Sequence, residues 1–268
     1  MNFWQLEGTH YVSDYKSSFV NGLIEHPYKL PDVRCTVCRE YLGGDSVLPC
    51  ACPTYLRKSF SAPADVAIEE FNRLAKKVKV AVEKQGLSSS LVQPGCILQP
   101  AFLDIASKPT ADCLWPGFSP LVSLRIREKL ESLRLRDIAF AEVTLRKVGT
   151  KSAKLTPPPP STGEPEDIVD EVPTRKFPKG RRRYFELCVY ARSAPPPGRE
   201  LLSVCSTCGG KKFNWTRGGK LIMAESMWSG ADIFVLETTA IILITDTLKQ
   251  ELQKLRPTNV EFTRFPAA

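Results

Sequence analysis

The sequence predicts an α+β fold, a mixed domain that a zinc ion holds together through two CxxC knuckles and that contains two repeated strand–helix–strand units. Three observations support this prediction. Two Cys-x-x-Cys pairs, Cys35/Cys38 and Cys205/Cys208, lie far apart in the chain. Residues 121–140 are similar to residues 243–262. A Pro-rich and charge-rich stretch separates the two halves of the sequence.

The first half, residues 1–149, begins with a short strand predicted at residues 2–6, and the first CxxC pair follows. A helix is predicted from Asp65 to Gln85, because apolar residues recur there three and four apart. These residues are Ala67, Phe71, Leu74, Val78 and Ala81. We expect Asp65 to cap this helix and Gly86 to end it. Residues 87–118 are expected to form loops with one or two brief strands.

Each copy of the repeat starts with a short apolar strand that ends in a hydroxyl residue, Ser123 or Thr245. We expect this hydroxyl to cap the helix that follows, and a turn and an alternating strand to complete the unit. The copies align without a gap. The aligned pairs are Val122 with Ile244, Ser123 with Thr245, Ile126 with Leu248, Leu130 with Leu252, Leu133 with Leu255, Ile138 with Val260 and Phe140 with Phe262. Chance similarity is the alternative, but the ungapped alignment favours duplication or a shared packing role.

Residues 150–183 are predicted to form a flexible loop. Consecutive prolines, an acidic block and a basic block leave little apolar surface to offset the entropy of ordering. The second half, residues 184–268, carries the second CxxC pair and predicted strands at residues 184–190, 232–237 and 240–245. We expect the two halves to form one composite domain.

The composition excludes several classes of protein. The nine cysteines are odd in number and unevenly spaced, which disfavours a secreted disulfide framework. No apolar run is long enough to span a membrane, and no signal peptide is evident, so we expect a cytoplasmic protein. The net charge of +8 permits nucleic-acid binding. The basic run at 176–185 follows an acidic block, however, which favours a solvated loop.

Two CxxC pairs supply the four thiolates of a tetrahedral Zn²⁺ site. We expect one structural Zn²⁺ per chain, bound by Cys35, Cys38, Cys205 and Cys208. Idle thiols and a thiol-redox pair are the alternatives. A redox CxxC normally precedes a helix, and neither pair here is followed by a convincing helical pattern. Cys50 and Cys52 are weaker substitutes.

No catalytic arrangement is apparent in the sequence. The chain has two histidines, His10 and His26, and neither lies in a zinc-protease motif. Phosphate-binding loops, dinucleotide-binding motifs and nucleophile motifs are also missing from the sequence. We therefore predict that the protein is not an enzyme.

The motifs Leu30-Pro31-x-Val33-x-Cys35-x-x-Cys38 and Cys205-x-x-Cys208-Gly209 resemble those of the double-CXXCG motif family of myxobacteria. The resemblance covers nearly the whole chain outside 150–183. Arg39 departs from it, because the family has glycine at that position. Members of the family include immunity proteins for contact-delivered, Sit-type toxins.

The resemblance implies a protein that binds a cognate toxin stoichiometrically and neutralises it without turnover. Loops 87–118 and 150–183 would then set the partner, with exposed aromatic residues as anchors. The candidate anchors are Trp115, Phe118, Trp215 and Trp228. A nucleic-acid-binding zinc protein is the first alternative and a thiol-redox protein the second. The identity of the toxin, the contact surface and the oligomeric state stay open.

Overall fold

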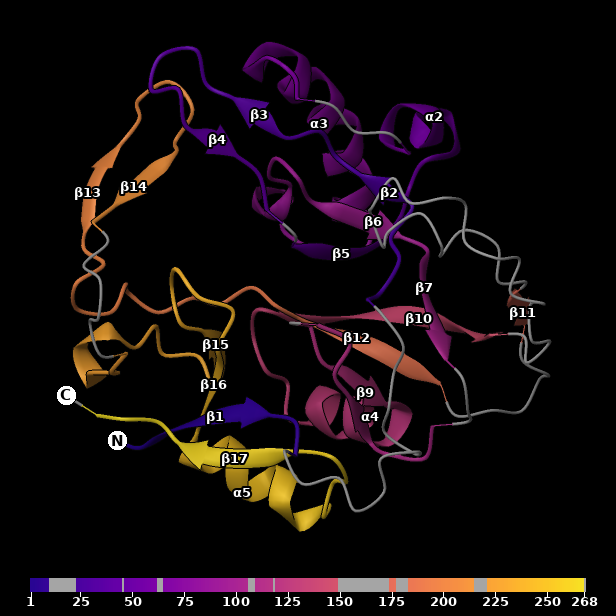
Figure 1. The fold of residues 1–268 in the computed structure, drawn as a ribbon, viewed down its shortest axis with the longest axis vertical. Coiled ribbons are helices and arrows are strands. Elements are labelled where there is room, and N and C mark those ends of the chain that lie inside the picture. Colours follow the sequence, from indigo (N-terminus) through magenta and orange to yellow (C-terminus); the bar gives the residue numbers. More distant parts are fainter. Residues whose placement is uncertain are drawn as a thin grey trace, which may run out of the picture.

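The computed structural model describes residues 1–9, 23–44, 46–61, 65–105, 109–117, 119–148, 174–176, 183–214 and 221–267. This part of the chain contains both α-helices and several sheets, which confirms the prediction of a mixed helix-and-sheet fold (Figure 1). Of the predicted flexible loop 150–183, only residues 174–176 and 183 are described, so the rest of that prediction lies outside the described residues.

The strands are β1 (Phe3–Glu7), β2 (Tyr28–Lys29), β3 (Val33–Arg34), β4 (Tyr41–Leu42), β5 (Val47–Ala51), β6 (Ile97–Gln99), β7 (Ala101–Ile105), β8 (Cys113–Leu114), β9 (Leu121–Ser123), β10 (Ile138–Val148), β11 (Thr174–Lys176), β12 (Tyr184–Val189), β13 (Leu201–Val204), β14 (Lys211–Phe213), β15 (Ile233–Val235), β16 (Ile242–Thr245) and β17 (Glu261–Arg264). The α-helices are α2 (Arg57–Phe60), α3 (Ile68–Glu83), α4 (Leu124–Ser132) and α5 (Asp246–Lys254). Short 3₁₀ turns occupy η1 (Thr54–Leu56), η2 (Ser89–Leu91) and η4 (Glu225–Met227).

The N-terminal layer packs α3 against a three-stranded sheet of order β2-β6-β5. The buried face of α3 carries Phe71, Leu74, Val78 and Val82, close to the predicted stripe. The predicted start of this helix is wrong. The Val66 amide donates to the Asp32 carbonyl at 3.0 Å, which keeps residues 65–67 extended and moves the first helical residue to Ile68.

Two regions outside the N-terminal layer share one arrangement of strands and helix with each other. The α4 unit (β8, β9, α4, β10 and β12) places β9 and β10 on either side of β12. The α5 unit (β15, β16, α5, β17 and β1) places β16 and β17 on either side of β1. In both units the flanking strands run antiparallel to the central strand, and a helix joins them. The central strand follows the helix in the α4 unit but comes first in the chain in the α5 unit.

Strand register equates the two units residue by residue. Tyr184 faces Ser123 across β12 and β9, as Phe3 faces Thr245 across β1 and β16. Leu187 faces Phe140, as Leu6 faces Phe262. The turns agree as well. The left-handed φ values of Arg134 (51°) and Asp137 (61°) recur at Arg256 (47°) and Asn259 (60°).

The two helix caps differ. Thr245 Oγ1 accepts from the Leu248 amide, as predicted. The prediction for Ser123 is wrong, because no side-chain cap forms and its hydroxyl donates to Asp112 Oδ1 at 3.0 Å. Thr245 Oγ1 makes the matching bond to Asp232 at 2.7 Å, so each hydroxyl links its helix to the preceding hairpin.

The two units share one core, and equivalent residues from each meet in it. The buried members include Leu6 and Leu187, Val122 and Ile244, Ile126 and Leu248, and Leu130 and Leu252. At the surface, Lys129 Nζ donates to Glu251 Oε2 at 2.6 Å. Contact between equivalent positions on α4 and α5 is what an approximate twofold relation between the units produces.

Candidate metal centre

The four cysteines lie at the tips of two short antiparallel ribbons. The first CxxC turn (residues 35–40) joins β3 to β4, and the second (residues 205–210) joins β13 to β14. The ribbons come from distant parts of the sequence and meet tip to tip (Figure 1). A Cβ atom on Gly210 would lie 2.8 Å from Leu42 Cδ2, so the second turn approaches the first ribbon closely.

The four sulfur atoms form one cluster, as predicted. All four Sγ atoms lie within 4.8 Å of one another, and no cysteine is in a disulfide. The Cys35–Cys205 sulfur distance is 4.0 Å and the Cys38–Cys208 distance is 3.7 Å. A tetrahedron of thiolates at about 2.3 Å from a Zn²⁺ ion has edges of about 3.8 Å. The donor set and its spacing therefore suit one tetrahedral metal ion.

The two turns have the same backbone hydrogen bonds. The Arg39 amide donates to the Cys35 carbonyl at 3.0 Å, and the Gly209 amide donates to the Cys205 carbonyl at 2.8 Å. Both residues are left-handed, with φ of 60° at Arg39 and 70° at Gly209. Arg39 therefore keeps the turn geometry that a glycine would adopt more easily. Arginine at position 39 therefore adds strain to this turn and leaves its shape intact.

Backbone amides aimed at the sulfurs favour thiolates. Amides of Cys208 and Thr207 lower the pKa of Cys205 to about 6, and amides of Cys38 and Val37 lower the pKa of Cys35. Desolvation raises the pKa of Cys208 to about 12, and its neighbouring sulfurs add to the rise. Four crowded sulfurs cannot all ionise without a compensating cation, which is the role that a bound metal ion has in such a site.

The remaining cysteines lie away from the cluster. Cys50, Cys52, Cys96, Cys113 and Cys188 are all buried. Burial raises the pKa of Cys50, Cys52 and Cys96 to about 11 in each case, so these thiols stay protonated. The structure does not bring Cys50 or Cys52 into the metal cluster.

Two of the candidate anchors can be placed, and both serve inside the fold. Trp115 Nε1 donates to the Asn259 carbonyl at 2.8 Å, and Trp228 Nε1 donates to the Ala231 carbonyl at 2.7 Å. Both indoles are half-buried. Phe118 and Trp215 lie outside the described residues.

The sequence analysis missed a pair of titratable residues, of which one is buried and the other half-buried. Glu186 is 2% exposed on β12, and its Oε2 lies 3.3 Å from His26 Nε2. The signal was available, because Glu186 interrupts an otherwise apolar strand, Tyr184-Phe-Glu-Leu-Cys-Val189. His10, the other histidine, lies outside the described residues.

Comparison with known proteins gives no assignment. No family model matches the chain, and no curated protein matches it significantly. In the described part of the chain, no helix has the length and apolar character needed to cross a membrane.

Proposed function

We propose that this protein is an immunity protein that binds a cognate contact-delivered bacterial toxin stoichiometrically and neutralises it. One structural Zn²⁺, held by Cys35, Cys38, Cys205 and Cys208, stabilises the fold. The observation that supports the proposal is the four-sulfur cluster, because it brings together the two motifs that resemble those of the double-CXXCG family. Four thiolates fill a zinc shell, whereas a catalytic zinc keeps one position open for water or substrate.

The structure around the cluster supports a binding role. Leu201, Leu202 and Val204 on β13 are 44%, 59% and 54% exposed. Exposed apolar residues in one short strand are typical of a surface that another protein covers. Arg34 and Arg39 on the first ribbon and Lys211 and Lys212 on β14 are also exposed. The toxin face that docks on these ribbons is therefore expected to be acidic with an apolar centre.

The correspondence between the α4 and α5 units supports the inference that the strand–helix–strand units arose by duplication. Matching register, matching left-handed turn residues and the matching Asp112–Ser123 and Asp232–Thr245 bonds all favour it over chance. The duplicated body is then the frame on which the zinc-linked ribbons are displayed.

The test of function is protection. Cells that express the toxin encoded beside this chain are expected to grow only when the chain is co-expressed. Leu202→Glu is expected to abolish protection and leave the thermal midpoint unchanged, since Leu202 is 59% exposed. The matched control is Val80→Glu, which changes a residue 51% exposed on α3 and should still protect. Equal protection by both variants would reject the β13 surface, and no protection by the native chain would reject immunity.

The zinc ion is tested separately by native mass spectrometry, which should find one zinc per chain. Zero or two would contradict the four-sulfur site. The competing functions predict other outcomes. Nucleic-acid binding would weaken steeply with salt. A thiol-redox enzyme would turn over a disulfide substrate and lose that activity in Cys35→Ser.

A further inference from the structure

The cysteines of the metal cluster are the most accessible in the chain. Cys38, Cys205 and Cys208 are half-buried, whereas Cys35 and the five cysteines outside the cluster are buried. Oxidation of a cysteine requires that the oxidant reach its sulfur atom. The second ribbon presents two accessible sulfur atoms to solvent and the first ribbon presents one, so the second ribbon is the more accessible half of the centre.

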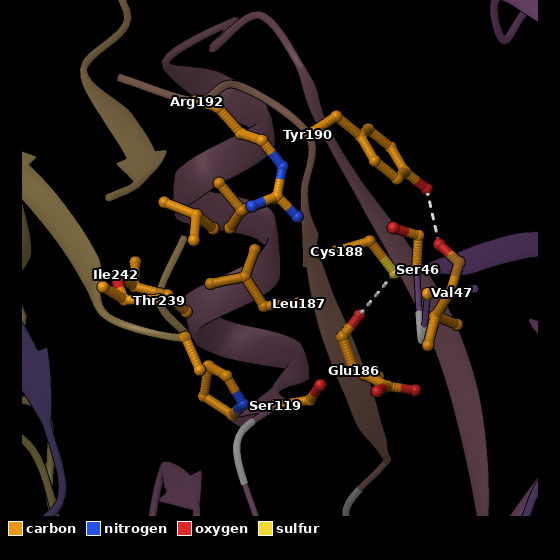
Figure 2. Close-up of a pocket in the computed structure, with 15 residues that line it drawn as sticks. Ser46, Val47, Ser119, Glu186, Leu187, Cys188, Tyr190, Arg192, Thr239 and Ile242 are labelled. Carbon is orange, nitrogen blue, oxygen red and sulfur yellow. Dashed lines mark hydrogen bonds between the residues drawn. The ribbon is translucent and has the colours of Figure 1, made fainter. Parts of the chain in front are cut away.

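The cluster also differs from the other cysteines in chemical form. A cysteine that binds a metal ion is a thiolate, and the thiolate is the form that attacks an oxidant. Cys188 gives the contrast, because it lines a cavity of about 340 Å³ beside β12 together with Glu186. Its Sγ donates to the Glu186 carbonyl at 3.7 Å (Figure 2). Burial raises the pKa of the Cys188 thiol, so it stays protonated and is expected to react slowly.

Cys205 and Cys208 remain neighbours whether or not a metal ion is bound. They lie three residues apart in a turn that the Gly209 amide closes by donating to the Cys205 carbonyl at 2.8 Å. The Cys205 amide in turn donates to the Gly210 carbonyl at 2.9 Å. Contacts between the ribbons, such as the 3.7 Å between the sulfurs of Cys38 and Cys208, last only while the ribbons stay together. The second turn is therefore the place where a disulfide can form and persist after the ribbons part.

We propose that the metal centre is a redox switch, in which a peroxide oxidises Cys205 and Cys208 to a disulfide and so detaches the second ribbon from the first. The two thiolates give up two electrons, an S–S bond forms between their Sγ atoms, and the O–O bond of the peroxide breaks. With hydrogen peroxide, two protons from solvent complete two molecules of water. The inference rests on the proposed zinc site but not on the proposed immunity.

Formation of this disulfide removes two of the four metal ligands. Only Cys35 and Cys38 then remain for the ion, which is too few for a stable tetrahedral site. The contacts that still hold the second ribbon are polar, such as Lys211 Nζ to Glu237 Oε1 at 3.5 Å. Oxidation should therefore displace β13, which carries the surface proposed to bind the toxin.

The test treats the zinc-loaded full chain with hydrogen peroxide and follows zinc with a chromogenic indicator. Release of the bound zinc is expected, with one disulfide formed for each zinc released. Peptide mapping without reduction should place this disulfide between Cys205 and Cys208, with Cys188 still a free thiol. Hydrogen exchange in residues 201–214 should become faster on oxidation. Dithiothreitol with added zinc should reverse both changes.

Two variants with matched chemistry locate the reactive pair. Cys205→His and Cys38→His each replace one thiolate by an imidazole, which is also a zinc ligand. Zinc content is measured first, and release is expressed per bound zinc. Cys205→His should release zinc at least about tenfold more slowly than Cys38→His, because only the latter keeps both cysteines of the second turn. Cys188→Ala is the control outside the centre and should release zinc at the native rate.

The outcomes separate failure of the switch from failure of the zinc site. Zinc that stays bound in peroxide would refute the switch alone, whereas a chain isolated without zinc would refute the site. A disulfide between Cys35 and Cys38, or between the ribbons, would also overturn the proposal. Should neither histidine variant bind zinc, peptide mapping of the native chain decides the question.

Discussion

The two ribbons that carry the cysteines share a turn geometry but differ in support. The first belongs to the N-terminal core, since Val33 on β3 is fully buried and Leu42 on β4 packs against the same cluster. In the second, all four residues of β13 are exposed. Its links to the body are polar, for example Lys211 to Glu237 at 3.5 Å. A metal ion would therefore be the main anchor of the second ribbon and a secondary anchor of the first.

Loss of the metal ion should have the largest effect, and this effect should be larger in the second ribbon than in the first. Chelation, or Cys208→Ser, is expected to speed amide exchange in residues 201–214 on the order of 100-fold or more, while β3 and β4 change less. The thermal midpoint of the whole chain should also fall. Hydrogen-exchange mass spectrometry measures both ribbons at once. Ser206→Ala, in the same turn but not a ligand, is the control. Equal loss of protection in both ribbons would contradict the conclusion that the metal ion is the main anchor of the second ribbon alone.

Truncation of apolar residues should give the next largest difference. Val33→Ala removes a fully buried side chain and is expected to cost about 2 kcal/mol of stability. Leu202→Ala removes a side chain that is 59% exposed and should change stability by less than about 0.5 kcal/mol. Denaturant unfolding of the zinc-loaded protein measures both. A large cost for Leu202→Ala would show that the second ribbon packs on the body after all.

Substitutions at the residue with positive φ in each turn should change stability by less, and in opposite directions in the two ribbons. Arg39→Gly should stabilise the protein by about 1 kcal/mol, because an L-residue is strained at positive φ. Gly209→Arg should destabilise it by about as much, since φ there is 70° and no atom stands near a new Cβ. Glu40→Gly is the control, and should not stabilise. Thermal midpoints measure these changes. A higher midpoint for Gly209→Arg would contradict the expected strain of an L-residue at positive φ.

The smallest effect concerns a hydrogen bond that only the first ribbon has. Tyr41 Oη donates to Asp32 Oδ2 at 2.6 Å, and this bond raises the pKa of Tyr41. A raised pKa means that the contribution to stability is present below the ordinary tyrosine pKa and is lost as the pH rises through the folded value. Tyr41→Phe should therefore show less loss of thermal midpoint than the native chain as the pH rises from about 9 to about 12. An identical fall of the thermal midpoint at alkaline pH in Tyr41→Phe and the native chain would show that other groups cause the fall.

Each half of the metal cluster could be predicted from sequence because CxxC spacing fixes the geometry of two ligands locally. The meeting of the two pairs was predicted because a tetrahedral Zn²⁺ site needs four ligands. The longer helices and the strands of the two repeat copies were also accessible, since hydrophobic periodicity is local. The short strands β2 to β5, β13 and β14 were not predicted. The start of α3 was not, because the cross-chain bond from Val66 to Asp32 overrides the capping preference of Asp65. The bond from Ser123 to Asp112 does not explain why Ser123 forms no cap, since Thr245 donates to Asp232 in the same way and still caps α5.

Long-range pairing was the part that sequence patterns could not supply. Nothing in residues 2–6 indicates that this strand lies between two strands from the other end of the chain. The end of the β9–β12 pairing was equally hidden, since it depends on where β9 stops. Glu186 stood out in its strand, but its surroundings could be recognised only once His26 and the cavity were in place.

The position of β1 has a consequence for how the protein is made in the cell. β1 leaves the ribosome well before its two partners, β16 and β17, which follow only after β15 has been translated. At about 5–20 residues per second, β1 waits many seconds with both edges unpaired. Its apolar side chains stay exposed to other nascent chains during that interval. Slow completion of the α5 unit, rather than local helix formation, is therefore expected to limit the yield of native protein during expression.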